Sequence, residues 1–292
     1  IMTCSRISGL HEKGREKQSV GGNDTVQEND VILELKDVAM YFGKVAALAG
    51  ASLRVRKGQI HSVIGPNGAG KTVMMNCISG LYRPQKGEIY FKGERINHLR
   101  PYERAERGMS RTFQKVEVFG GMTVLDNIRL GRHIHLKSGI MSGSVYLGKT
   151  AREEIENRQF IEEEIIDLLE IEHIRHKPVG MLPYGLQKRV ELGRALALKP
   201  DLLILDEPLA GLNLEETEDM ARFVIDVNED PRWNITCLLV EHDMGVVMDL
   251  SHQIFVLNFG NTIMDGTPQE VQNNPEVIKA YLGEEDLYAT RR

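Results

Sequence analysis

Residues 65–72, which read Gly-Pro-Asn-Gly-Ala-Gly-Lys-Thr, constrain the fold of this chain more than any other segment. They fit the pattern GxxxxGK[ST] without a mismatch. A β-prone run, residues 60–64, precedes them, and a run with helical character, residues 73–79, follows. In such a context the glycines let backbone N–H groups turn inward around phosphate oxygens, and the start of the helix adds a favourable dipole. The sequence therefore predicts a strand, a phosphate-binding turn and a helix.

Each residue of this loop is a candidate nucleotide contact. Lys71 is expected to reach the β- and γ-phosphates, and the Thr72 hydroxyl is expected to ligate Mg²⁺. The full set of expected contacts is Gly65, Pro66, Asn67, Gly68, Ala69, Gly70, Lys71 and Thr72. The sequence thus predicts ATP and Mg²⁺ as the bound species.

A second element of the same site lies 130 residues further along. An apolar run, residues 202–205, ends in Asp206 and Glu207, and residues 235–240 form another apolar run. Such runs are typical of strands buried on both faces of a parallel sheet. Asp206 is expected in the outer coordination sphere of Mg²⁺, and Glu207 is placed to orient or deprotonate an attacking water. Two carboxylates at an exposed strand end can also be unremarkable, but the phosphate loop favours the catalytic interpretation.

Composition and charge argue against several classes of protein. The 292 residues contain 36 Lys and Arg against 42 Asp and Glu, a net charge of −6, which argues against a dedicated nucleic-acid binder. The longest run without charged residues, residues 250–264, is too short and too polar for a bilayer span. We expect no secretory signal, because the N-terminus lacks an apolar segment. Cys4, Cys77 and Cys237 are too widely spaced for a disulfide framework or a zinc site, so a reducing cytoplasm is expected.

Further motifs follow in a fixed order along the chain. These are Tyr41-Phe42-Gly43, Ser110-Arg-Thr-Phe-Gln114, Leu182-Pro-Tyr-Gly-Leu186, Ala210-Gly-Leu-Asn213 and Val240-Glu-His242-Asp. Together with the phosphate loop and the Asp206–Glu207 pair, they resemble the nucleotide-binding subunits of ATP-binding cassette (ABC) transporters over residues 31–283.

This resemblance implies roles for single residues. Gln114 would touch Mg²⁺ and the attacking water and report to a membrane partner, and His242 would be the switch histidine. Phe42 would stack on adenine, although it could instead be a core aromatic with Tyr41 in the stacking role. Glu207, His242 and Gln114 form the expected catalytic set, with Thr72, Gln114 and Asp206 around the metal. Taken alone, a glutamine or histidine at such positions is more often an ordinary polar residue.

The resemblance also implies a fold and its divisions. The expected fold is α/β, a P-loop ABC ATPase core with a mostly parallel sheet, an N-terminal antiparallel β part and an α-helical subdomain. We expect residues 1–30 to be a flexible tail, residues 31–284 the ATPase domain with the helical subdomain at about 115–195, and residues 285–292 a C-terminal tail. Within the subdomain, apolar residues at helical spacing predict a helix over residues 151–174.

One motif departs from its family. The usual signature is Leu-Ser-Gly-Gly-Gln, but this chain has Pro183 at the serine and Tyr184 and Leu186 at the following glycine and the glutamine. Proline offers neither hydroxyl nor N–H, so the backbone N–H groups of Gly185 and Leu186 are expected to meet the phosphate of a second subunit's ATP. Gly185→Asp is then expected to be severe, because a Cβ and a carboxylate would stand in the phosphate's path, and Pro183→Ala mild. Alternatively the loop is degenerate and the ATPase weak.

Finer similarities indicate one branch of the family. They lie in residues 122–128, 131–136, 241–247, 266–268 and 274–283, and they resemble the importers of branched-chain amino acids. The implied assembly has a second ATP-binding subunit, two membrane permeases docked at a groove near Gln114, and an extracytoplasmic solute-binding protein, with no nucleic acid. The subunit would lie at the cytoplasmic face of the membrane.

Other readings stay open at this point. An ABC-type ATPase of DNA repair or translation, not coupled to transport, usually carries a coiled-coil insertion, zinc cysteines or two cassettes. A GTPase needs an NKxD-type motif, which this sequence lacks. A non-catalytic nucleotide scaffold would not need Lys71, Asp206, Glu207 and His242, and an importer subunit for another small polar solute is a further alternative.

Overall fold

The computed structural model describes residues 30–132 and 155–281 of the chain. Its centre is a six-stranded sheet in the order β10-β9-β3-β8-β7-β6. The strands are β3 (Ile60–Ile64), β6 (Met109–Arg111), β7 (Leu202–Asp206), β8 (Thr236–Val240), β9 (Gln253–Asn258) and β10 (Asn261–Gly266). All neighbours are parallel except β10, which runs antiparallel to β9. Every residue of β3, β7 and β8 is buried, as the apolar runs predicted.

A second, antiparallel sheet covers one side of this layer, in the order β2-β1-β4-β5. Its strands are β1 (Val31–Phe42), β2 (Val45–Arg56), β4 (Lys86–Phe91) and β5 (Glu94–Arg95). The pairing of β1 with β2 runs from Val31 opposite Arg56 to Phe42 opposite Val45. A mostly parallel sheet with an antiparallel N-terminal part confirms the expected α/β fold.

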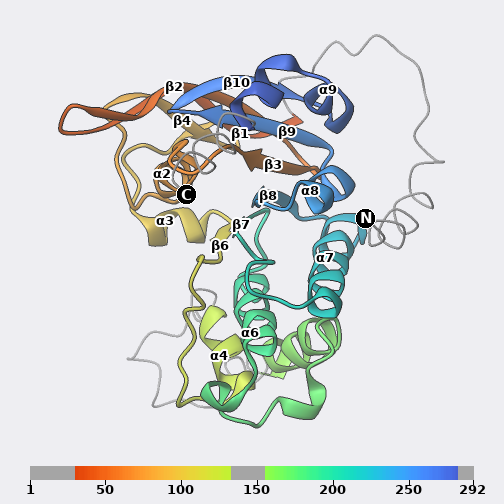
Figure 1. Ribbon diagram of the computed structural model, residues 1–292. Coiled ribbons are helices and arrows are strands. Elements are labelled where there is room, and N and C mark those ends of the chain that lie inside the picture. The colour runs from red at the N-terminus through yellow and green to blue at the C-terminus, as the bar shows by residue number, and fades with distance from the viewer. Residues whose placement is uncertain (1–29, 133–154, 282–292) are drawn as a thin grey trace.

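Between β6 and β7 the described residues form helices and connecting loops, with one isolated bridge between Thr123 and Pro178. They form α4 (Val124–Gly131), a π-helical segment η4 (Phe160–Ile166), two short 3₁₀ turns, η5 (Glu172–Ile174) and η6 (Val179–Met181), and α6 (Tyr184–Leu196). Figure 1 shows this group hanging from one edge of the sheets, with α6 leading back into the strands.

The helix expected over residues 151–174 differs from the observed one. Residues 151–154 lie outside the described part of the chain, and η4 ends at Ile166. Glu170 adopts a left-handed backbone conformation, with φ of 58°, which an α-helix cannot continue through. Glu172–Ile174 is therefore a separate 3₁₀ turn. Of the expected tails, residues 1–30 and 285–292, all but Asp30 lie outside the described residues.

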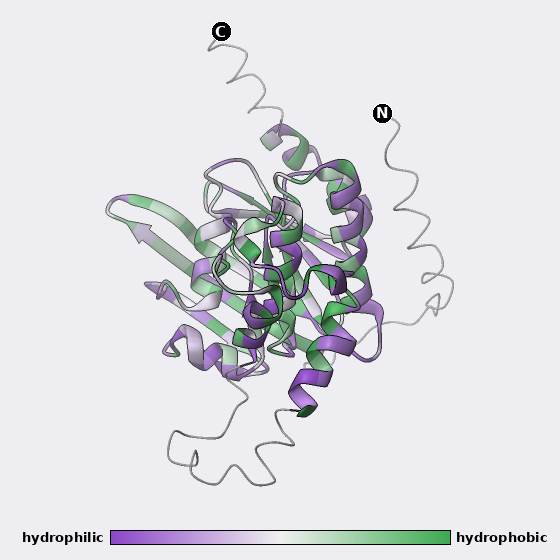
Figure 2. Ribbon diagram, turned by 90° about the horizontal axis from the view of Figure 1, so that it is seen from below, coloured by the Kyte–Doolittle hydropathy of each residue, from purple (hydrophilic) through white to green (hydrophobic). Residues whose placement is uncertain are grey.

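The remaining helices flank the central sheet. They are α2 (Lys71–Ser79), α3 (Pro101–Glu106), α7 (Leu214–Glu229), α8 (Met244–Leu250) and α9 (Pro268–Gln272). No helix among the described residues has the length and apolar run needed to cross a bilayer. In Figure 2 the strands are largely hydrophobic, whereas the helices around them alternate hydrophobic and hydrophilic faces.

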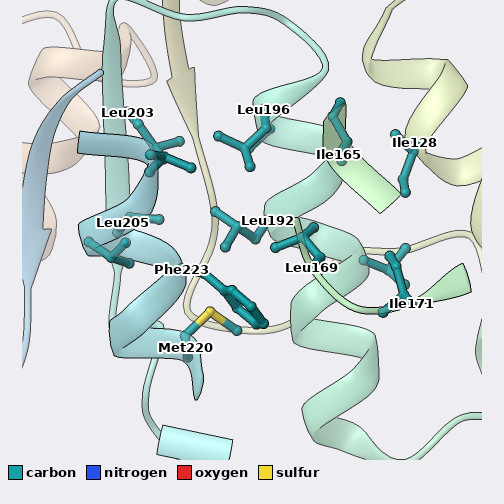
Figure 3. Close-up of a cluster of buried hydrophobic side chains, with 14 of the residues drawn as sticks. Ile128, Ile165, Leu169, Ile171, Leu192, Leu196, Leu203, Leu205, Met220 and Phe223 are labelled. Atoms are coloured by element: carbon teal, nitrogen blue, oxygen red, sulfur yellow. The ribbon is translucent and has the colours of Figure 1, made fainter. Parts of the chain in front are cut away.

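Helix α6 is joined to the sheet and to the helical group by one continuous apolar core. Leu192 and Leu196 of α6 lie between Leu203 of β7 and the side chains of η4 and α4, as Figure 3 shows. Gly193 makes this close approach possible, since a Cβ there would lie 3.0 to 3.2 Å from Leu169, Ile128 and Ile165. Helix α6, β7 and the helical group therefore share one apolar core.

Candidate active site

The phosphate loop connects β3 to α2 and depends on its glycines. Gly65 and Gly70 have φ of 149° and 106°, and a Cβ on either would collide with a backbone carbonyl, that of Leu257 or Ala47. Only glycine fits such positions. Ala69 donates its N–H to the Pro66 carbonyl at 3.1 Å, which closes the turn. The structure therefore forms the cradle that the sequence predicted.

Lys71 and Thr72 begin the helix behind this loop. The Lys71 ammonium is buried and donates to the carbonyl oxygens of Gly65 and Pro66, so it lies against the loop. Thr72 is exposed. The N-cap of α2 is Gly70, with no side-chain cap and no acidic residue in the first turn. The N-terminus of α2 thus offers backbone donors, an ammonium and a hydroxyl without a competing carboxylate.

Asp206, at the end of β7, is 3% exposed and pairs with Arg111. Arg111 Nη2 donates to Asp206 Oδ2 at 2.8 Å, and its Nη1 donates to Asn76 Oδ1 and Ser79 Oγ at 2.8 and 2.7 Å. The Thr112 hydroxyl accepts from the Asp206 N–H at 3.4 Å. The guanidinium thus gives the buried carboxylate a direct ion-pair partner. Sequence reasoning assigned Arg111 no role, although it stands within the Gln114 motif.

Gln114, Glu207 and His242 come together at the carboxyl ends of adjacent strands. Gln114 Nε2 donates to Glu207 Oε2 at 2.9 Å, and His242 Nε2 lies 2.6 Å from Glu207 Oε1. This follows from the topology, since β7 and β8 are parallel neighbours, with Asp206 opposite Val240. Two side chains that are distant in the sequence, Gln114 and His242, thus contact the carboxylate of Glu207.

The backbone at Glu207 is unusual. Its φ is 51°, in the left-handed region that non-glycine residues rarely adopt. Burial opposes ionisation of this carboxyl, but the hydrogen bonds from His242 and Gln114 outweigh it and hold the pKa of Glu207 below its ordinary value. Glu207 is therefore an ionised acceptor at neutral pH.

Three buried charged residues behind the site escaped the sequence analysis. Lys188, Glu191 and Glu241 are each 4% exposed. Burial lowers the pKa of Lys188 and raises the pKa of both Glu191 and Glu241. For Lys188 and Glu191, only the charge pattern of α6, with Lys and Glu on its apolar face, could have indicated burial.

The signature loop leads into α6. Pro183 is the N-cap, with φ of −53° and ψ of 153°, and offers no side-chain hydrogen bond. Tyr184, Gly185 and Leu186 form the first turn, where backbone N–H groups have no acceptor within the helix. The Tyr184 side chain is 42% exposed. The loop thus presents backbone donors, as expected.

The structure corrects the reason given for a severe Gly185→Asp effect. Gly185 is buried, and a Cβ there would collide with the carboxylate of Glu216 on α7 of the same chain, not stand in an open phosphate path. The substitution would therefore bring a second carboxylate against Glu216.

Phe42 ends β1 with its ring 47% exposed. The ring packs edge-on against Tyr82, with 5.6 Å between centroids. The neighbouring Tyr41 is half-buried, and its backbone exchanges two hydrogen bonds with the Gln85 side chain. Exposure favours Phe42 over Tyr41 as the adenine-stacking ring, and this assignment stays a prediction.

The donors present suit magnesium held with a nucleotide. The described ranges, 30–132 and 155–281, hold no group of three or more His, Cys, Asp or Glu that could bind a metal by itself. Mg²⁺ in nucleotide sites takes one or two protein oxygens, and phosphates and water supply the rest. The Thr72 hydroxyl and the Asp206 carboxylate are oxygens of this kind.

Comparison with known proteins agrees with this geometry. The model of a family described as "ABC transporter" matches residues 48–210, and one described as "Branched-chain amino acid ATP-binding cassette transporter" matches residues 261–286. The chain is 40% identical over 253 residues to the high-affinity branched-chain amino acid transport ATP-binding protein BraF of Pseudomonas aeruginosa, covering 87% of this chain and 98% of that protein. It is 39% identical over 255 residues to LivG of Escherichia coli, with the same coverage.

Solved structures give the same result. The ADP conformation of an ATP-binding cassette of an ABC transporter superposes with a TM-score of 0.74 at 31% identity, covering 87% of this chain and 99% of that one. A dimeric cassette in a post-hydrolysis state, bound to ADP and Pi, gives a TM-score of 0.67 at 25% identity, covering 81% and 99%.

Proposed function

The chain belongs to the ABC transporter family of ATP-binding cassettes, and from this premise we propose that it is the ATP-hydrolysing subunit of an importer for branched-chain amino acids. The observation that carries the enzymatic part is the convergence of Gln114 and His242 on the ionised Glu207. The solute class is supported by the match over residues 261–286 and by the names of the relatives.

In this proposal the chain's own groups divide the work of hydrolysis. Residues 65–72 bind the phosphates, with Lys71 moving from the loop carbonyls to the phosphate oxygens, and Phe42 stacks on adenine. Thr72, Asp206 and Gln114 would hold Mg²⁺, which would supply positive charge to the phosphate oxygens. Glu207 accepts the proton of the attacking water, and His242 orients Glu207.

The first turn of α6 has backbone N–H groups without a side-chain cap, which supports a head-to-tail pair of subunits. Each ATP would lie between the phosphate loop of one subunit and Tyr184, Gly185 and Leu186 of the other. The dimeric ADP- and Pi-bound cassette among the structural relatives supports this arrangement. We further propose residues 31–284 as one ATPase domain with the helical subdomain at about 115–195 and tails at either end.

A groove beside Gln114 is suited to a permease helix. It has a volume of about 270 Å³ and is lined by apolar and aromatic side chains, among them Leu81, Tyr102 and Phe113, with Arg111 in the same lining. Leu81 and Tyr102 are 49% and 54% exposed. A short amphipathic helix of each permease would pack here, at the cytoplasmic face of the membrane, with an external solute-binding protein delivering the amino acid.

Turnover in the assembled transporter tests the proposal. We expect ATP hydrolysis by the full complex in lipid vesicles to rise when the binding protein is loaded with leucine, isoleucine or valine. Stimulation by another solute alone would change the proposed solute class, but the assignment as an ATPase would stand. Absence of ATP hydrolysis by both the purified subunit and the complex would overturn the enzymatic assignment.

A further inference from the structure

The backbone that carries Glu207 is clamped from α6. The Lys188 ammonium donates to the carbonyl oxygens of Glu207 and Pro208 at 2.8 and 2.9 Å. On the opposite side, the Glu241 carboxylate accepts from the Leu209 N–H at 2.7 Å, and the Glu207 N–H donates to the Val240 carbonyl at 2.9 Å. Residues 207–209 are therefore held through both their carbonyl and their N–H groups.

This clamp faces a strained residue. The left-handed conformation of Glu207 is unfavourable for a residue other than glycine and persists only where surrounding contacts enforce it. With φ of 51°, the side chain reaches Gln114 and His242 while the carbonyl reaches Lys188. A buried lysine that supplies hydrogen bonds to two consecutive carbonyls is such an enforcing contact.

The same lysine reaches the signature loop. Lys188 lies one turn beyond Tyr184, and its Nζ is 5.5 Å from the centre of the Tyr184 ring. One further turn along, the Glu191 carboxylate accepts from the Phe113 and Glu117 N–H groups at 3.4 and 3.3 Å, on either side of Gln114. Helix α6 thus connects the signature loop to the backbones of both Glu207 and Gln114.

We propose that Lys188 is a positioning residue that sets the carboxylate of Glu207 for hydrolysis and couples it, through α6, to whatever occupies the signature loop of the same chain. The inference rests on the proposed function, because the occupant of that loop is the ATP held by the second subunit. Binding of one ATP would then position the catalytic carboxylate that acts on the other.

The test separates positioning from binding and from folding. Lys188→Met keeps the length and the apolar stem of the side chain but removes the donors, and Lys188→Arg keeps donors and charge. We expect Lys188→Met to lower kcat by about ten-fold or more while the Kd for a fluorescent ATP analogue stays within about three-fold of wild type. Lys188→Arg should recover a substantial part of kcat, and the exposed Lys177→Met serves as the matched control.

Two results would overturn the inference: a kcat of Lys188→Met within about three-fold of wild type, or a parallel loss of affinity and turnover that Lys188→Arg does not repair. If Lys188→Met does not fold by circular dichroism, Lys188→Gln, which can keep one donor, is judged by the same criteria. A wild-type protein without ATP turnover would instead contradict the proposed function itself.

Discussion

Two kinds of helix start occur among the described residues of this molecule: those with a side-chain cap and those without one. In the described part of the chain, α4, α7, α8 and α9 begin with a side chain that accepts from a first-turn N–H, namely Thr123, Asn213, Asp243 and Thr267. Helices α2 and α6 begin on Gly70 and Pro183, which carry no such acceptor. Both helices that sequence motifs assign to phosphate, α2 and α6, thus lack a side-chain cap; the short helix α3, which begins after Arg100, lacks one as well.

The difference shows that a binding site at a helix start lowers the stability of that helix. A side-chain cap stabilises a helix start by about 1 kcal/mol, because it supplies an acceptor for an otherwise unpartnered N–H. Leaving that acceptor out keeps the donors available for a ligand. Helix α2 compensates at its other end, where Arg104 donates to the carbonyls of Cys77 and Ile78 at 2.7 and 2.6 Å.

Removing the cation at the start of α2 should have the largest effect. Lys71→Ala takes away the ammonium beside the phosphate loop, and we expect loss of nucleotide affinity by about 100-fold or more. Fluorescence titration with an ATP analogue measures it, with Lys177→Ala as control. Wild-type affinity in Lys71→Ala would mean that the uncapped start of α2 does not bind phosphate.

Removing Arg104, which donates to the carbonyls at the end of α2, should have the second largest effect. Arg104 is 2% exposed, and besides Cys77 and Ile78 it donates to the carbonyls of Ile96 and Leu99. Burial lowers its pKa to about 10, so it remains charged at neutral pH. Arg104→Met leaves these acceptors unsatisfied, and we expect a loss of about 3 kcal/mol in unfolding free energy, measured by urea titration. An unchanged midpoint would show that water replaces the guanidinium.

Gly185→Asp should destabilise the fold by about 2 kcal/mol, since its Cβ would overlap the carboxylate of Glu216. Thermal unfolding without nucleotide measures this separately from any effect on turnover. If stability is unchanged while turnover collapses, Gly185 acts at the phosphate alone, as the sequence first suggested. The substitution thus distinguishes a packing role from a binding role at the start of α6.

A matched pair of cap variants should give the smallest effects. Thr267→Ala removes a hydroxyl that accepts from the Glu270 N–H, at a cost of about 1 kcal/mol. Pro183→Ala removes no acceptor and should change stability by less than about half of that. Equal losses in urea unfolding would contradict the distinction between the two kinds of helix start.

The sequence predicted the parts whose chemistry is local. The loop at residues 65–72 and the Asp206–Glu207 pair each combine their chemistry with an adjoining strand, so motif and strand could be placed together. His242 could be placed because its strand follows β7. Lys188, Glu191 and Arg111 could not be assigned roles, because these depend on which backbone groups the packing of α6 and β6 brings within reach.

Two misjudged details have the same origin. The end of the helix near Glu170 depends on a left-handed residue that has no glycine to mark it. The direction of a Cβ at Gly185 depends on how α6 and α7 pack, which the signature motif does not contain. Both are set by tertiary contacts, whereas the phosphate loop is set by its own backbone.

The central claim is that Glu207 is the base in the hydrolysis of an ATP held between two cassettes. The Glu207→Gln variant tests this claim most directly. The amide keeps the shape of the side chain but cannot accept the proton of water, so turnover should fall by about 100-fold or more while ATP still binds. Analytical ultracentrifugation of the full chain should then show a dimer with ATP and a monomer with ADP. A Glu207→Gln protein that binds ATP, stays monomeric and turns over at the wild-type rate would contradict both the base and the shared site.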